Sequence, residues 1–381
     1  MSYVSCGSAR AQSAEESLPL KAKRVLEDSG ALDRLSRGDI ALIKVHMGEK
    51  WGFRSLRPKL VRSLVEAIKD MAATPVVGDT TSISLRSNRG TAPGYLEVAW
   101  SNGFTPQVIG APVVILDGLR GLHHVKLKAG RVLGEVEAAA GVLEADFILS
   151  VAHFKGHART GIGGALKNVG VGCLSKTGKA RVHLARKPWV KAELCDGCGK
   201  CISFCPAGAI ELKGGKAEVS EERCLWGCGC WELCKAFSTW SEMHRSNKEM
   251  SMAVAEAAKA VLDEFRGKHG FVNYIVDVTL HCDCAPFSDI PATHDIGVVA
   301  SRDPVAVDKA SVDLVNSARA YSPLAESLKV AGPGADKFSA LHIYPPTARF
   351  SEQGKPSWRT LLEYAEQIGL GSQSYSIAEI L

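Results

Sequence analysis

Four cysteines between residues 195 and 205 constrain the fold and the chemistry of this chain more than any other feature of its sequence. Cys195, Cys198, Cys201 and Cys205 are separated by two, two and three residues, and Pro206 follows the last cysteine. At this spacing three thiolates can bind one 4Fe-4S cluster while the fourth binds a neighbouring cluster. The motif therefore predicts an iron-sulfur redox protein.

The residues between these cysteines suit a short loop around a cluster. Gly197 and Gly199 permit the tight turns that such a loop needs, and Pro206 prevents the loop from continuing as a helix. A structural zinc site and a disulfide framework are the alternatives, but zinc sites usually present two separated pairs of cysteines. The spacing favours the cluster loop of bacterial-type ferredoxins.

A second group of cysteines has nearly the same length but an altered spacing. Its members are Cys224, Cys228, Cys230 and Cys234. The regular motif would place the second ligand at Gly227, one position before Cys228. We expect two clusters, and the displaced cysteine leaves two interpretations open: a locally rebuilt loop around a normal cluster, or an altered, labile or three-iron cluster.

The order of ligands in two-cluster ferredoxins predicts how the eight thiolates are shared. The first 4Fe-4S cluster is expected to take Cys195, Cys198, Cys201 and Cys234. The second is expected to take Cys205, Cys224, Cys228 and Cys230. Residues 207–223 between the two groups resemble the small hairpin of such ferredoxins, with a turn at Gly214 and Gly215.

Composition is that of an ordinary globular protein. The 381 residues are 46% hydrophobic and 23% charged, which suits two or three domains. Neither a signal peptide nor a run of roughly 18 apolar residues is recognisable. Eight cysteines at cluster spacings require a reducing compartment, so we expect a cytoplasmic protein, most simply of an anaerobic or microaerobic cell. The first residues, including Cys6, are expected to be loose.

The net charge of +5 does not indicate a nucleic-acid partner. It arises from 46 basic and 41 acidic residues that are dispersed along the chain, which is typical of a solvated surface. A basic stripe interleaved with aromatic residues is not recognisable. We expect neither nucleic-acid binding nor a membrane span.

Apolar strands alternate with amphipathic helices along most of the chain. Strands are predicted at 39–48, 74–80, 111–118, 146–156, 271–279 and 295–301. Helices are predicted at 57–71, 91–104, 136–145, 249–266 and 303–318. The fold class is therefore α/β, with a largely parallel sheet flanked by helices. A small inserted ferredoxin-like (α+β) module interrupts it, so the α/β domain occupies 1–188 and 241–381 and the two-cluster module occupies 189–240.

Most of residues 40–316 also resembles a known family. The segments that carry the resemblance are 43–58, 150–173, the two cysteine groups and 282–316, in that order. They are similar to the uncharacterised iron-sulfur centre proteins built on a domain of unknown function (DUF362) with a ferredoxin insert. The resemblance implies an α/β domain with cluster-binding cysteines, and it implies no particular reaction.

The first candidate site outside the cysteine groups follows the strand predicted at 146–156. His153, Lys155, His157 and Lys167 gather around a glycine-rich turn at the end of this strand, where open α/β sheets bind ligands. We take these four as candidate catalytic residues. The alternative is a tight turn whose glycines serve packing and whose histidines are merely exposed.

The glycines of this turn are candidates for binding an anion. Backbone N–H groups around Gly161, Gly163 and Gly164, with the charge of Lys167, can hold a phosphate or a carboxylate. The dinucleotide-binding fingerprint is not met because Leu166 occupies the position of its third glycine. A nicotinamide cofactor is therefore not inferred.

The second candidate site is the pair Cys282 and Cys284. If residues 280–284 are extended, both thiols point to one face and can share an additional metal ion or act as redox groups. The alternative is a pair of buried free cysteines. We lean towards a functional role, in a cleft that His46, Glu49 and Lys50 can also line.

Two classes of function remain open. The first is an oxidoreductase whose two 4Fe-4S clusters pass low-potential electrons to a small-molecule substrate or a metal site on the α/β domain. The second is a non-enzymatic electron carrier, or a protein that delivers metal or clusters. We expect an electron-donor or electron-acceptor protein as a partner. Convergence of His153, His157, Cys282 and Cys284 around one pocket would favour the first class.

Overall fold

A single sheet joins residues from both ends of the chain. The computed structural model describes residues 1–320, 323–344 and 350–380. The strands of the main sheet are β1 (Ser2–Ser8), β2 (Ile40–Lys44), β3 (Thr74–Asp79), β4 (Val113–Ile115), β7 (Phe147–His153), β12 (His269–Ile275), β13 (Gly297–Ser301) and β14 (Tyr375–Glu379). Their order across the sheet is β14-β1-β13-β12-β7-β2-β3-β4.

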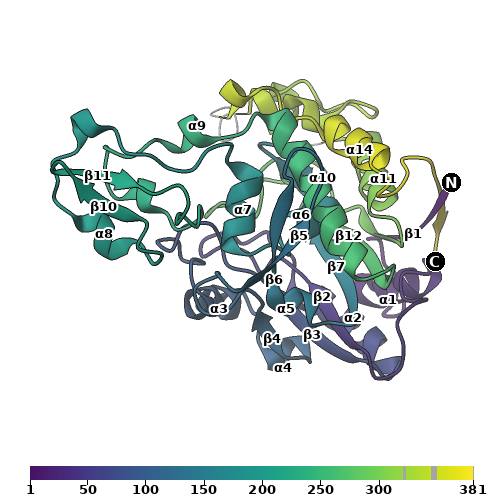
Figure 1. The fold of residues 1–381 in the computed structure, drawn as a ribbon. Helices are drawn as coiled ribbons and strands as arrows, with labels where there is room; N and C mark the ends of the chain where they lie inside the picture. The colour runs from purple at the N-terminus through teal and green to yellow at the C-terminus, as the bar shows by residue number, and fades with distance from the viewer. Residues whose placement is uncertain (321–322, 345–349, 381) are drawn as a thin grey trace.

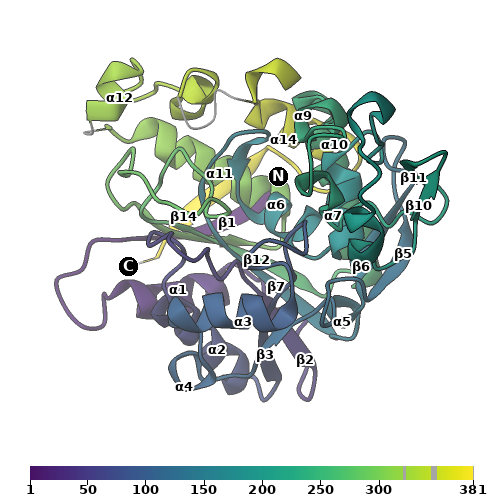
Figure 2. The same cartoon turned by 90° about the vertical axis from the view of Figure 1, so that its left-hand side faces the viewer.

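Helices cover both faces of this sheet (Figure 1, Figure 2). On one face lie α1 (Leu18–Asp28), α2 (Pro58–Asp70), α3 (Ala92–Ser101) and α4 (Pro106–Ile109). On the other face lie α6 (Ala165–Gly170), α10 (Asn247–Glu264), α11 (Pro304–Ser317) and α14 (Trp358–Gln367). The shorter helices are α5 (Ala140–Leu143), α7 (Lys176–His183), α9 (Trp240–Met243), α12 (Pro323–Ser327), η1 (Ala192–Leu194), η2 (Cys230–Glu232), η3 (Lys337–His342) and η4 (Ser351–Gln353).

Successive side chains of each strand point to opposite faces of the sheet and divide the core into two layers. On β2, Ala41 and Ile43 face one side of the sheet and pack in a buried cluster with Leu64 of α2. Leu42 faces the other side and belongs to the buried cluster that contains Val254 of α10. Because successive side chains of a strand point to opposite faces, strands that are apolar throughout must be covered on both sides.

The directions of the strands confirm the predicted fold class. Strands β12, β7, β2, β3 and β4 run parallel to one another. Strand β13 is antiparallel to both β12 and β1, and β14 is parallel to β1. The expectation of a loose N-terminal segment is wrong, because Ser2–Ser8 pairs with a strand on each side and Val4 is fully buried.

The prediction of a helix at 136–145 is wrong for the first half of this segment. Residues Glu135–Ala139 form strand β6, which pairs with β5 (His124–Lys128), and only the short helix α5 follows. Arg181 of α7 donates to the buried carboxylate of Glu137 at 2.5 Å. Pairing with a neighbouring strand and this ion pair outweigh the helix propensity of the alanine-rich segment.

The cysteine-rich segment lies to one side of the sheet (Figure 1). It contains α8 (Lys200–Phe204) and the predicted hairpin, formed by β10 (Ile210–Lys213) and β11 (Lys216–Val219) with Gly214 and Gly215 at its turn. No described strand of this segment joins the main sheet. The domain boundaries at 189 and 240 stay predictions.

Candidate functional site

The main candidate site is a cavity of about 320 Å³, here called the large cavity, at the carboxyl ends of the parallel strands. Lys44 ends β2, Asp79 ends β3 and His153 ends β7, and all three line the cavity. From β2 the chain passes to β3 and β4 on one side, and β7 then lies on the other side of β2. The cavity therefore lies at the point where the strand order reverses, where open α/β sheets bind their ligands.

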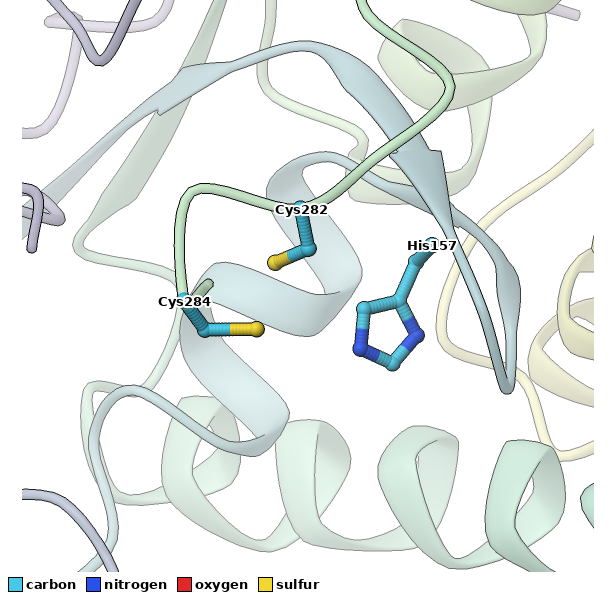
Figure 3. Close-up of side chains that lie close together, drawn as sticks. All are labelled: His157, Cys282 and Cys284. Carbon is cyan, nitrogen blue, oxygen red and sulfur yellow. The ribbon is translucent and has the colours of Figure 1, made fainter. Parts of the chain in front are cut away.

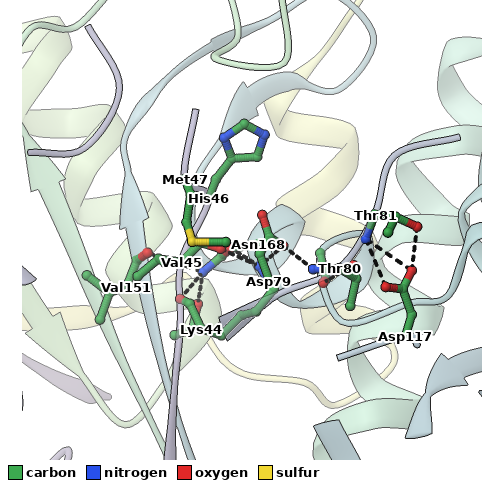
Figure 4. Close-up of polar contacts among 12 residues, drawn as sticks. Lys44, Val45, His46, Met47, Asp79, Thr80, Thr81, Asp117, Val151 and Asn168 are labelled. Atoms are coloured by element: carbon green, nitrogen blue, oxygen red, sulfur yellow. Dashed lines mark hydrogen bonds and ion pairs between the residues drawn. The ribbon is translucent and has the colours of Figure 1, made fainter. Parts of the chain in front are cut away.

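A buried polar network holds one wall of this cavity (Figure 4). Lys44 and Asp79 form an ion pair at 2.8 Å, with 1% and 3% of their side chains exposed. Burial alone would raise the pKa of Asp79, but the charge of Lys44 lowers it to about 2. The Asn168 amide accepts from Lys44 Nζ at 3.1 Å and donates to Ser150 at 2.9 Å. The network fixes the ends of β2, β3 and β7 relative to one another.

Three potential metal ligands that line the same cavity meet at another part of its wall (Figure 3). His157 lies on the short strand β8 (Lys155–His157), which pairs with β9 (Gly161–Gly163), and Cys282 and Cys284 lie on the loop after β12. Their ligand atoms all lie within 4.8 Å of one another. The Nδ1 atom of His157 is 2.8 Å from the Thr160 hydroxyl, and the other ring nitrogen faces the two sulfurs. One imidazole and two thiols form a donor set that suits thiophilic transition metals.

The residue between the two cysteines anchors their loop. Asp283 accepts from His153 Nδ1 at 3.0 Å and lies 3.1 Å from Lys155 Nζ. The other nitrogen of His153 is 2.7 Å from the Val276 carbonyl oxygen. Both ring nitrogens of His153 therefore already have hydrogen-bond partners, and neither is left to bind a ligand. Of the predicted residues, His157, Cys282 and Cys284 converge, whereas His153 and Lys155 position the loop.

The surroundings of Cys282 favour its thiolate form. The hydrogen bond from the Cys284 thiol, together with the charges of Lys167 and Lys155, lowers the pKa of Cys282 well below its usual value despite burial. Cys282 is buried, whereas Cys284 is exposed. Residues 281–284 form bends and a turn rather than the extended strand considered above, but the two thiols still face each other (Figure 3).

A buried carboxylate lies beside the glycine turn that is predicted to bind an anion. The N–H groups of Ala165 and Leu166, at the start of α6, donate to the carboxylate of Asp308 at 2.7 and 3.0 Å. Burial raises the pKa of Asp308 to about 6. Gly161 has a φ of +81° and packs against the backbone of Trp358. Asp308 thus takes two of the N–H groups nearest to this turn, and Gly163, Gly164 and Lys167 line the cavity.

The second set of predicted cluster ligands surrounds a separate small cavity. Cys205, Cys224, Cys228 and Cys230 all line it, among apolar side chains such as Ile210. Burial raises the pKa of Cys224 and of Cys230, and it raises the pKa of Cys228 to about 12. All twelve cysteines of the chain are free thiols.

The first set of predicted ligands is closer to solvent. Cys198 and Cys234 are exposed. Burial raises the pKa of Cys201, and the neighbouring Cys234, Cys195 and Cys198 raise it further. Hydrogen bonds from the backbone N–H groups of Ala217 and Gly197 lower the pKa of Cys195.

The packing of the second loop explains its irregular spacing. A Cβ atom at Gly227 would lie 2.5 Å from the carbonyl oxygen of Lys176, which is less than real Cβ atoms show. The preceding residue, Trp226, has a backbone φ of +67°. A cysteine therefore does not fit at the regular position, and the thiol is carried by Cys228 instead.

A short segment connects this loop to the large cavity. The N–H groups of Ser84 and Leu85 donate to the carbonyl oxygens of Gly227 and Cys228 at 2.9 and 3.0 Å. The preceding residues, Ser82 and Ile83, line the large cavity. Trp240 also lines it, and its ring centroid is 5.3 Å from that of Trp231, next to Cys230.

Several residues of the cavity were not found from the sequence. They are Lys44, Asp79, Thr80, Arg89, Lys179, His183 and Trp240. The sequence did contain a signal for Lys44 and Asp79. Each is a charged residue at the end of an otherwise apolar strand. Of the residues expected in the cleft, His46 lines the cavity, Glu49 pairs with Arg89 at 2.7 Å, and Lys50 is exposed.

Comparison with known proteins defines the family. Residues 41–313, well over half of the chain, match the model of the Domain of unknown function (DUF362). The chain belongs to the DUF362 family. No curated protein matches this DUF362 protein.

One similar solved structure is that of the lactate racemase apoprotein from Thermoanaerobacterium thermosaccharolyticum, with 12% sequence identity and a TM-score of 0.40. The alignment covers 84% of this chain and 59% of that chain, so this chain spans less than two thirds of that protein's length. No described helix of the DUF362 protein is both long and apolar enough to cross a membrane.

Proposed function

We propose that this DUF362 protein is an iron-sulfur redox protein that binds two 4Fe-4S clusters and passes electrons to the large cavity. The observation that carries the proposal is the grouping of the cysteines. Cys205, Cys224, Cys228 and Cys230 share one cavity, and the charges of Cys195, Cys198 and Cys234 act on Cys201. Bound clusters of this type supply one-electron transfer at low potential.

The donor set and its surroundings fit such clusters. Backbone N–H groups donate to three of the sulfurs: Ala217 to Cys195, Ala209 to Cys205 and Trp226 to Cys224, at 3.4, 3.3 and 3.4 Å. Hydrogen bonds to sulfur stabilise cluster thiolates and tune the reduction potential. The buried thiols of the second set lose their protons on binding metal, so assembly there is linked to proton release.

The surroundings of the two cysteine sets favour electron transfer from the first set to the second set and then to the large cavity. Cys198 and Cys234 are exposed, so a partner protein that donates electrons can approach the first set. Ser84 and Leu85, next to the residues that line the large cavity, donate to the backbone carbonyls of Gly227 and Cys228 in the loop of the second set. The segment 82–85 and the Trp231–Trp240 pair are the packed connections between the second set and the cavity.

We further propose that His157, Cys282 and Cys284 hold an additional metal ion at the cavity wall. Three protein ligands with a cavity beside them are typical of a catalytic metal site, which keeps a coordination position open. Lys155 and His153 hold Asp283 and thereby orient both thiols. This arrangement supports the oxidoreductase function. A carrier or metal-delivery protein is the second candidate, favoured by the exposure of Cys284 at the rim.

Metal analysis of single variants tests both assignments. Anaerobically purified Cys228→Ser protein should contain about four iron and four sulfide ions fewer than wild-type protein. Cys173→Ser is the matched control, because Cys173 is buried but belongs to neither set. Equal iron content in Cys228→Ser and wild-type protein would contradict the cluster assignment.

The additional metal has its own test. His157→Ala and Cys284→Ser should each lose about one metal ion per chain, of any element, while the sulfide content stays at the wild-type value. Wild-type protein with no metal beyond its sulfide-matched iron would contradict the additional site.

A further inference from the structure

The large cavity has more positive than negative charge. It is lined by the cations Lys44, Arg89, Lys155, Lys167 and Lys179 and, among the described residues, by one carboxylate, Asp79. Three of the cations are paired at 2.8, 2.7 and 3.1 Å, in the pairs Lys44–Asp79, Arg89–Glu49 and Lys155–Asp283. Lys167 and Lys179 have no carboxylate within ion-pair distance in the described part of the chain.

The two unpaired lysines differ. The Nζ atom of Lys179 donates to the Thr80 hydroxyl at 2.6 Å, to the Thr80 carbonyl at 3.1 Å and to the Thr81 carbonyl. Burial lowers the pKa of Lys179 to about 7, so it carries only part of a charge near neutrality. Lys167 is half-buried, and within residues 1–320, 323–344 and 350–380 its side chain makes no hydrogen bond or ion pair.

The nearby groups do not neutralise Lys167. Asp283 already has two partners, since His153 Nδ1 lies 3.0 Å from it and Lys155 Nζ lies 3.1 Å from it. The thiolates of Cys282 and Cys284 would be balanced by a divalent ion bound between them. Carboxylate and phosphate oxygens are the groups that unpaired Lys and Arg side chains bind most strongly, through charge-assisted hydrogen bonds.

We propose that the cavity binds a small anionic substrate through a carboxylate or phosphate group, with Lys167 as its principal charged contact. This rests on the proposed function, in which the cavity is the place where electrons are used. It differs from an anion site at the glycine turn, because the carboxylate of Asp308 holds the N–H groups of Ala165 and Leu166 there. The exposure of Cys284 and the partial exposure of Lys167 leave a route of entry.

Calorimetric titration of the anaerobic holoprotein with acetate and with inorganic phosphate tests the proposal. Ionic strength is held constant with chloride. We expect saturable binding of one anion per chain, and the anion that binds more tightly distinguishes a carboxylate from a phosphate substrate. Lys167→Gln should weaken this binding roughly tenfold or more, the loss expected for one charge-assisted hydrogen bond. Lys167→Arg should retain most of the affinity.

Lys128→Gln is the matched control, because Lys128 is an exposed lysine on β5 and does not line the cavity. The Lys128→Gln protein should bind acetate or phosphate with the same affinity as wild-type protein. The proposal is overturned if neither anion binds saturably, or if Lys167→Gln binds as tightly as wild-type protein. Iron and sulfide are measured on the same samples, so a failure of the cluster assignment is recognised separately from a failure of anion binding.

Discussion

Replacing Gly227 with alanine should destabilise the second cysteine loop. An added Cβ atom would meet the carbonyl oxygen of Lys176 at 2.5 Å and its carbonyl carbon at 2.9 Å. Neither the backbone of Lys176 nor that of Gly227 can move easily to relieve this contact. Lys176 is fully buried and donates through Nζ to the carbonyl oxygens of Ser82 and Gly90, while the Gly227 carbonyl accepts from Ser84 N–H.

The magnitude follows from the contact distance. Real Cβ atoms essentially never approach closer than 3.0 Å, so the loop must move by about 0.5 Å against a backbone atom. Overpacking of this kind costs about 1–3 kcal/mol. Gly332→Ala is the control, because nothing lies within 4 Å of a Cβ atom there, and it should change the free energy of unfolding by less than about 0.5 kcal/mol.

The same contact predicts what happens when the regular ferredoxin spacing is restored. The double variant Gly227→Cys with Cys228→Gly carries its thiol at the regular position, yet it should bind less iron than wild-type protein. Anaerobic iron and sulfide analysis, together with denaturant unfolding, measures both effects. A double variant with the full iron content and unchanged stability would refute the steric explanation of the displaced cysteine.

Three further predictions concern the large cavity. Lys44→Met should lower the free energy of unfolding by about 3–5 kcal/mol, measured with denaturant, because it leaves the buried carboxylate of Asp79 without its partner; an unchanged midpoint would contradict this. Lys179 has a pKa of about 7 in the folded protein and 10.5 in the unfolded chain, so the unfolded state binds more protons between these values. The stability of wild-type protein relative to Lys179→Met should therefore rise from pH 7 upward by at most about 1.4 kcal/mol per pH unit, whereas parallel pH profiles would be inconsistent with a neutral buried lysine. Asp283→Asn should weaken the metal affinity of the His157, Cys282 and Cys284 site about 10–100-fold in chelator competition, because Asp283 anchors the loop through His153 and Lys155; wild-type affinity would show that this anchor is dispensable.

The pattern of apolar residues along the sequence was sufficient to predict the fold class. Strands β2, β3, β7, β12 and β13 are buried on both faces and therefore read as continuous apolar runs. Strand β6 was missed because its alanines favour a helix in isolation, and only pairing with β5 makes it a strand. Strand β1 was missed because its partners, β13 and β14, lie almost the whole chain length away.

The candidate site was predictable only where its residues are close in sequence. Cys282 and Cys284 are two residues apart, so the sequence CDC was enough to identify them as a candidate pair. The pair Lys44–Asp79 forms because β2 and β3 are parallel and in register, which the sequence does not reveal. The carboxylate that occupies the N-terminus of α6 comes from Asp308, 142 residues after Leu166.

Electron paramagnetic resonance of the dithionite-reduced anaerobic protein tests whether the eight cysteines hold two 4Fe-4S clusters. Two interacting clusters should give about two unpaired spins per chain with broadened lines, accompanied by about eight iron and eight sulfide ions. A single uncoupled signal with about four iron ions, or metal that is chiefly zinc, would contradict the assignment of two clusters.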